Sequence, residues 1–114
     1  VADVVWHGQS TRHIREGLHA AIELDDLRRV WRAVSPMVYF DKFSRWARNS
    51  LVVYAKYDLT FLPEFSRQVV EEFARRALNH KVVVLPCGHY SMGEFPYNYL
   101  DGWHLASFLR TAFE

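Results

Sequence analysis

Two short apolar runs, residues 50–55 (SLVVYA) and 81–86 (KVVVLP), each continue into a polar loop, and they decide the fold class. Their length and β-branched composition are typical of strands that are buried on both faces. The loop after the first run carries Asp58 (AKYDLT), and the loop after the second carries His89 (PCGHYS). Each expected strand therefore presents one titratable side chain just beyond its C-terminal end.

Helical patterns follow both runs. Residues 63–79 (PEFSRQVVEEFARRALN) repeat apolar side chains at helical spacing, and residues 99–113 (YLDGWHLASFLRTAF) indicate a closing helix. The order strand, helix, strand, helix predicts parallel strands joined by a right-handed crossover. The C-terminal ends of parallel neighbours meet at one rim of the sheet, where ligands and catalytic groups of open α/β sheets lie. We therefore expect Asp58 and His89 to lie close together.

The first 49 residues have a helical texture without a clear strand. Helical spacing or helix-start signals occur in residues 10–24 (STRHIREGLHAAIEL), 27–34 (LRRVWRAV) and 36–47 (PMVYFDKFSRWA). Asp25 or Asp26 is expected to cap the second of these helices. The opening residues 2–8 (ADVVWHG) are ambiguous between a strand and a helix.

Composition narrows the class of protein. Half of the 114 residues are hydrophobic, which is enough apolar material for a packed core. The 14 basic and 13 acidic residues give a net charge of +1, so no nucleic-acid partner is expected. A single cysteine excludes an intrachain disulfide and favours a reducing, cytoplasmic location. No apolar run approaches the ~20 residues of a membrane-spanning helix, and no signal peptide is expected.

From residue 50 to residue 114 the sequence resembles the C-terminal part of an α/β-hydrolase. Residues 54–73 (YAKYDLTFLPEFSRQVVEEF) are similar to the segment whose strand delivers the acid of a catalytic triad. Residues 82–97 (VVVLPCGHYSMGEFPY) resemble the final strand and its Gly-His loop. The order of acid before histidine agrees with that family. The resemblance implies an α/β fold in which a lid-like helical segment, 1–49, precedes a partial hydrolase domain, 50–114.

The resemblance also implies a chemistry for the two loop residues. Asp58 would accept a hydrogen bond from His89 and orient its ring, and His89 would act as the general base of a serine hydrolase. The substrate would be a small molecule with an ester or other acyl bond, and no cofactor is expected. Two alternatives stay open: Asp58 and His89 are ordinary loop residues, or the chain is a stand-alone, non-catalytic α/β module for oligomerisation or partner binding.

The nucleophile of such a hydrolase is not found. No G-x-S-x-G motif occurs, and the nearest string, HGQSTR at residues 7–12, has Arg12 where the second glycine should stand. Ser10 is therefore expected to cap a helix, and Cys87 to be a small packing residue. The serine and the oxyanion hole would lie upstream or on another chain. We accordingly expect this chain to be inactive by itself.

Two further expectations concern metals and assembly. None of the six histidines pairs in an H-x-x-x-H or H-E-x-x-H pattern, so no metal site is expected, and His80 and His104 should lie at the surface or at helix ends. An unpaired strand edge favours association with another chain. Four tryptophans add apolar surface that half a fold could hardly cover. The chain should therefore be a homo-oligomer or part of a longer polypeptide.

Overall fold

Two parallel strands form the sheet of this protein, and the structure, a computed structural model, describes residues 1–114. Strand β1 spans Ser50–Ala55 and β2 spans His80–Leu85, with Ser50 opposite His80 and Ala55 opposite Leu85. Helix α5 (Pro63–Arg75) makes the crossover between them. The parallel pair joined through a helix confirms the α/β class expected from the two β-branched runs.

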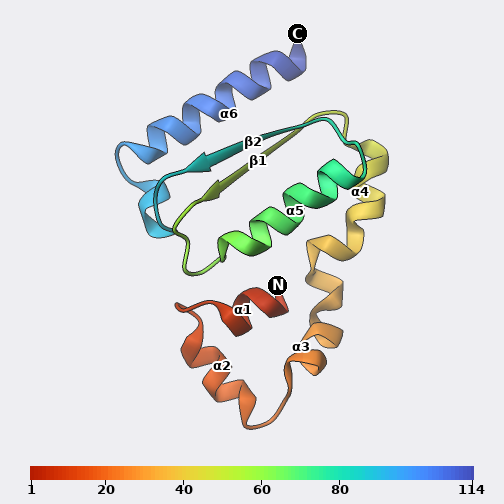
Figure 1. Ribbon diagram of the computed structural model, residues 1–114, viewed down its shortest axis with the longest axis vertical. Helices are drawn as coiled ribbons and strands as arrows, with labels where there is room; N and C mark the ends of the chain where they lie inside the picture. The colour runs from red at the N-terminus through yellow and green to blue at the C-terminus, as the bar shows by residue number, and fades with distance from the viewer.

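Helices cover both faces of the sheet (Figure 1). Helix α6 (Tyr97–Phe113) lies on one side and contacts both strands, and α5 lies on the other side against β1. The core cluster of the sheet consists of four buried side chains, Ala55, Val83, Leu85 and Cys87, and Tyr97 at the start of α6 packs against it. Most of these lie at the C-terminal half of the strands, so the best-packed part of the sheet is the part that leads into the two loops.

The first half of the chain is helical; in Figure 1 its first three helices lie below α5, and its last helix lies beside the C-terminal end of α5. Its elements are α1 (Ala2–His7), α2 (Arg12–His19), α3 (Leu24–Val30), the 3-10 turns η1 (Trp31–Val34) and η2 (Pro36–Tyr39), and α4 (Phe40–Trp46). The ambiguous opening residues are therefore a helix. The expectation that Asp25 or Asp26 caps a helix was wrong, because α3 begins at Leu24 and both carboxylates lie inside its first turn.

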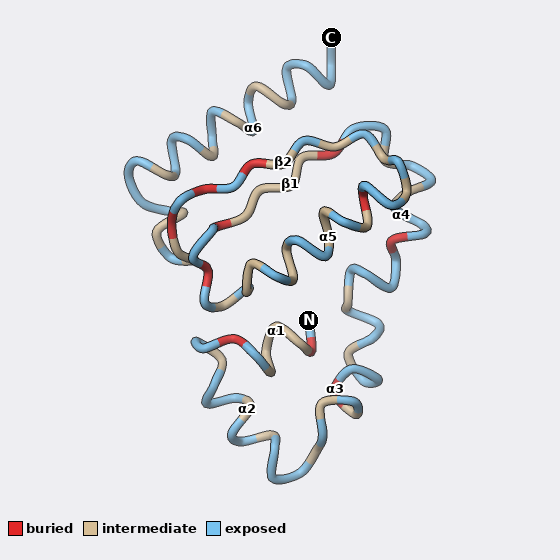
Figure 2. The backbone as a smooth tube through the Cα atoms, in the orientation of Figure 1, coloured by how far each residue is buried: buried red, intermediate tan, exposed pale blue.

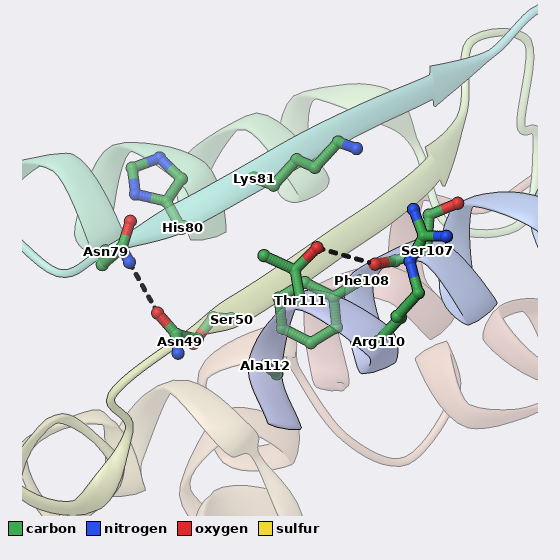
Figure 3. A pocket seen from close by; sticks show the side chains of 10 residues that line it. All are labelled: Asn49, Ser50, Asn79, His80, Lys81, Ser107, Phe108, Arg110, Thr111 and Ala112. Carbon is green, nitrogen blue, oxygen red and sulfur yellow. Dashed lines mark hydrogen bonds between the residues drawn. The ribbon is translucent and has the colours of Figure 1, made fainter. Parts of the chain in front are cut away.

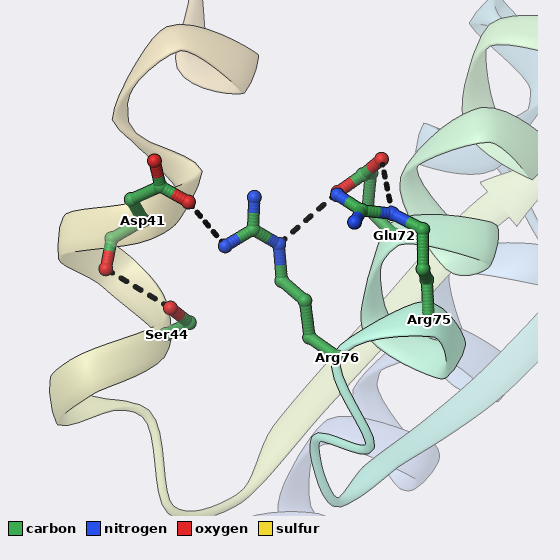
Figure 4. A network of polar contacts seen from close by, with 5 residues as sticks. All are labelled: Asp41, Ser44, Glu72, Arg75 and Arg76. Atoms are coloured by element: carbon green, nitrogen blue, oxygen red, sulfur yellow. Dashed lines mark hydrogen bonds and ion pairs between the residues drawn. The ribbon is translucent and has the colours of Figure 1, made fainter.

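Helix α4 is joined to the C-terminal end of α5 by aromatic and ionic contacts. Phe40 meets Phe73 edge to face at 5.1 Å. Arg76 donates hydrogen bonds to Asp41 on α4 and to Glu72 on α5 (Figure 4). Because Asp41 is exposed, the aromatic packing contributes more to this junction than the ion pair does.

Much of the chain is exposed to solvent (Figure 2). Its accessible surface is 8115 Å², compared with about 6,500 Å² expected for a globular monomer of its mass. Its radius of gyration is 16.0 Å, compared with about 13 Å for a globular chain of this length. Large apolar side chains that are more than 60% exposed include Trp46, Tyr90, Phe95, Tyr99, Trp103 and Phe113. Apolar surface is thus available for contact with another protein body.

No membrane-spanning helix was expected, and none of the helices combines the length and the apolar composition that a membrane span requires.

Candidate functional site: an aspartate–histidine pair at the rim of the sheet

The two strands remain paired beyond their last residues, and this brings the two loops together. The N–H of Lys56 donates to the carbonyl of Leu85 at 2.8 Å, and the N–H of Tyr57 donates to that of Cys87 at 3.0 Å. Asp58 follows Tyr57 directly, and His89 follows Cys87 by two residues. The parallel pairing therefore places both side chains at the same rim.

Asp58 is a buried carboxylate, with 5% of the residue exposed. Its Oδ1 accepts hydrogen bonds from the backbone N–H groups of Thr60 and Phe61, each at 2.8 Å. These two bonds fold the loop back over the carboxylate, in the manner of an Asx turn. One oxygen is thus held by the backbone of its own loop, and the other is available to the neighbouring loop.

The second oxygen of Asp58 is hydrogen-bonded to His89. Nδ1 of His89 lies 3.0 Å from Asp58 Oδ2, so the contact expected from the sequence is confirmed. Because a carboxylate only accepts hydrogen bonds, Nδ1 carries the proton, and the neutral ring has its lone pair on Nε2. Nε2 makes no hydrogen bond within the chain. The Asp58 contact therefore selects the tautomer in which Nε2 is able to accept a proton.

Two aromatic side chains hold the His89 ring in place. Phe61 stacks on it at 5.3 Å, and Tyr90 meets it edge-on at 5.2 Å. The His89 side chain remains 34% exposed, which leaves access to the ring for a reacting group. A hydrogen bond and two aromatic contacts together restrict both the position and the plane of the imidazole.

Ser10 lies beside the same loop, in a role that the sequence did not indicate. Its hydroxyl is hydrogen-bonded to the hydroxyl of Thr60, and Thr11 is the residue that precedes α2. The expectation that Ser10 caps a helix was therefore wrong. In the G-x-S-x-G motif of a hydrolase a strand precedes the serine, whereas here the helix α1 precedes Ser10. The Ser10 hydroxyl also makes no hydrogen bond to His89.

Cys87 is a packing residue, as expected. It is buried in the core cluster with Ala55, Val83 and Leu85. Burial raises the pKa of its thiol, and the nearby charge of Asp58 raises it further. Since the thiolate is the reactive form, both effects oppose a role as nucleophile.

The other histidines do not assemble into a site. No three His, Cys, Asp or Glu side chains converge as a set of metal ligands. His80 donates from Nδ1 to the carbonyl of Leu78 at 2.7 Å and packs on Phe73. His104, expected at the surface or a helix end, instead lies half-buried within α6, and its Nδ1 has no hydrogen-bond partner.

A cavity of about 360 Å³ lies at the opposite end of the sheet (Figure 3). It is lined mainly by polar side chains at the first residues of the strands and the last turns of α6, including Asn49, Ser50, Asn79, Lys81 and Arg110. Neither Asp58 nor His89 lines it. We place the candidate site at the aspartate–histidine pair, because only there are two titratable side chains fixed in a geometry that supports proton transfer.

Comparison with known proteins identifies no relative from which a function could be inferred. No family model, no curated protein and no solved structure matches the chain. The assignment of a function therefore depends on the positions of Asp58 and His89.

Proposed function

We propose that this chain supplies the acid and the histidine of an α/β-hydrolase-type catalytic triad that cleaves an ester or other acyl bond. The observation that carries the proposal is the 3.0 Å hydrogen bond between Asp58 Oδ2 and His89 Nδ1. The pair stands at the C-terminal rim of two parallel strands, the rim at which α/β enzymes place their chemistry. The order of the two residues along the chain is that of the α/β-hydrolase family.

The proposed mechanism follows from the tautomer of His89. Its Nε2 accepts the proton of a serine hydroxyl as the oxygen attacks the acyl carbon. The carboxylate of Asp58 stabilises the imidazolium that forms and keeps the ring oriented. His89 then returns the proton to the leaving group, and the same base activates the water that releases the acid product.

The serine comes from outside these residues. Ser10 pairs with Thr60, so we assign the nucleophile and the oxyanion hole to an upstream segment or to another chain. The large exposed apolar surface supports this assignment, because another protein body is needed to cover it. Both free edges of the two-stranded sheet also offer unpaired backbone groups for a further strand.

Apolar side chains around His89 favour a substrate with an apolar acyl group. Phe61 and Tyr90 contact the imidazole and are themselves 50% and 77% exposed. Leu59, two residues before Phe61, is also exposed. These side chains would lie against an acyl chain bound next to Nε2, and burying them would contribute to binding.

The second candidate function is a non-catalytic module for oligomerisation or partner binding. The exposed apolar side chains of α6, such as Trp103 and Leu105, favour it. In that case the bond between Asp58 and His89 only joins two loops.

Serine-directed phosphonate labelling distinguishes the two functions. The probe should label the complete assembly at a serine outside residues 1–114, and the variants Asp58→Asn and His89→Ala should abolish labelling. His13→Ala, at an exposed position on α2, is the matched control and should be labelled like the wild type. The 114-residue chain alone should remain unlabelled. Undiminished labelling of His89→Ala would refute the triad, and stoichiometric labelling of Ser10 would overturn the assignment of the nucleophile.

A further inference from the structure

The turn between α1 and α2 rests on the loop that holds Asp58. This turn, residues 8–11, lies next to the loop between β1 and α5 in Figure 1. The N–H of Gln9 donates to the carbonyl of Leu59 at 2.8 Å. The hydroxyl of Ser10 is hydrogen-bonded to that of Thr60. The first turn of the lid-like segment is thus attached to the two residues that follow Asp58.

Gly8 makes this close approach sterically possible. A Cβ atom at this position would lie 2.9 Å from the carbonyl oxygen of Thr60 and 2.7 Å from that of Val4. Both distances are shorter than real Cβ atoms show, and both atoms belong to the backbone, which does not rotate away as a flexible side chain would. The φ angle of Gly8 is −63°, so the position requires glycine for its small size and not for its backbone conformation.

The contacts continue from the turn to the imidazole. Leu59 and Thr60 are held by the turn, and the N–H groups of Thr60 and Phe61 hold Oδ1 of Asp58. The other oxygen of Asp58 binds His89. Displacement of the turn would therefore release the loop amides first and the aspartate–histidine pair next.

We propose that the 8–11 turn positions the Asp58–His89 pair, and that Gly8 is the positioning residue because it allows the turn to dock. The turn acts through the backbone of the Asp58 loop and touches no reacting atom. The consequence for catalysis rests on the proposed function, whereas the coupling between the turn and the pair stands on the contacts alone.

The test is the substitution Gly8→Ala, with Gly17→Ala as its matched control. A Cβ atom at Gly17 meets nothing within 4 Å, so the same change there should have no effect on the pair. Two readouts are measured on the complete assembly: hydrogen exchange of the peptide that covers residues 57–62, and the ¹⁵N NMR shifts of the His89 ring, which report its tautomer.

Gly8→Ala should accelerate exchange of the Thr60 and Phe61 amides by about tenfold or more. It should also convert the single Nδ1–H tautomer of His89 into a mixture, while the amides of β2 stay protected. Gly17→Ala should change neither readout. Unchanged exchange and an unchanged His89 tautomer in Gly8→Ala would overturn the proposal.

Ser10→Ala decides the matter if Gly8→Ala does not fold. Loss of this one hydroxyl should accelerate exchange of the same two amides several-fold, and no acceleration would refute the coupling. Both readouts are independent of phosphonate labelling. If phosphonate labelling did not depend on His89, the catalytic role would be refuted and the coupling between the turn and the pair would stand. If exchange of the two amides did not change, the coupling would be refuted and the catalytic role would stand.

Discussion

Nδ1 of His89 lies 3.0 Å from Oδ2 of Asp58, although 31 positions separate the two residues in the sequence. The continued strand pairing at Lys56 and Tyr57 brings the loops together, and the two loop amides hold the carboxylate. Asp58 thus has a structural role, folding its own loop, and a chemical role, orienting His89. Substitutions of different kinds should separate these roles.

Asp58→Ala should destabilise the protein by about 3 kcal/mol, because three part-buried hydrogen bonds to the carboxylate are lost at once. Asp58→Asn should cost about 1 kcal/mol, since the amide oxygen still accepts from Thr60 and Phe61. The free energies of unfolding are measured by urea denaturation. Equal losses in the two variants would show that the loop bonds to Oδ1 contribute nothing.

The same Asp58→Asn variant should reverse the tautomer of His89. The asparagine NH₂ group would donate to Nδ1, so the proton would move to Nε2, the atom that must be unprotonated in the proposed mechanism. In the complete assembly the acyl-transfer rate should fall by about 10⁴-fold. The ¹⁵N shifts of the ring check the tautomer independently of activity, and a ring that still has Nδ1–H in this variant contradicts the prediction.

Cys87 should react slowly with iodoacetamide in the folded protein. Burial and the charge of Asp58 both raise the pKa of its thiol, so less thiolate is present at pH 8 than in an unfolded chain. The alkylation rate should therefore rise by about tenfold or more when urea unfolds the protein. Equal rates in the folded and unfolded states would contradict the buried position of the thiol.

Stability at acid pH should depend on the contact between α1 and α3. Arg28 donates to Asp3 at 3.1 Å, and this hydrogen bond lowers the pKa of Asp3, with burial opposing it. A lowered folded-state pKa stabilises the fold above the ordinary value of 3.8, and this contribution is lost as the pH falls below it.

Arg28→Gln should accordingly lower the melting temperature at pH 7, and its difference from the wild type should shrink below about pH 4. Arg29→Gln is the control, because its partner Asp26 lies on the same helix and exposed local pairs contribute little. A difference between Arg28→Gln and the wild type that is constant from pH 7 to pH 3 would exclude the Asp3 contact as its cause.

Ala77→Gly should stabilise the protein by about 0.5–1 kcal/mol. Ala77 has a φ of +51° after the last turn of α5, in the left-handed region that favours glycine. The N–H of Leu78 donates to the carbonyl of Phe73, which completes a Schellman motif whose usual residue here is glycine. Ala106→Gly, inside α6, should instead destabilise by about 1 kcal/mol, and thermal melts of both variants measure the contrast.

The isolated chain should not sediment as a compact monomer at micromolar concentration. Its accessible surface exceeds that of a globular monomer, and Trp46 and Trp103 are 85% and 64% exposed. Sedimentation velocity should therefore show an oligomer or an expanded species. A compact monomer that melts cooperatively would favour the stand-alone module over the partial hydrolase.

The sequence by itself determined that there are two strands, although β2 (His80–Leu85) begins and ends one residue earlier than the run 81–86, and it determined the neighbouring positions of Asp58 and His89. Strand β1 has the bounds expected from the run SLVVYA, because a short β-branched segment between turn residues has few alternatives. The crossover rule then placed both loops at one rim, since a strand–helix–strand unit leaves the C-terminal ends of its strands side by side. These are local patterns joined by one general rule of topology.

Only the tertiary structure decided the roles of Gly8 and Ser10. The string HGQSTR suggested a degenerate nucleophile motif or a helix cap, but its residues instead dock on the Asp58 loop. That contact joins segments 50 residues apart, and no pattern in either segment indicates that the other is its partner. Hydrophobic spacing reports which face of one element is buried, whereas a contact between two polar loops depends on how all the intervening helices pack.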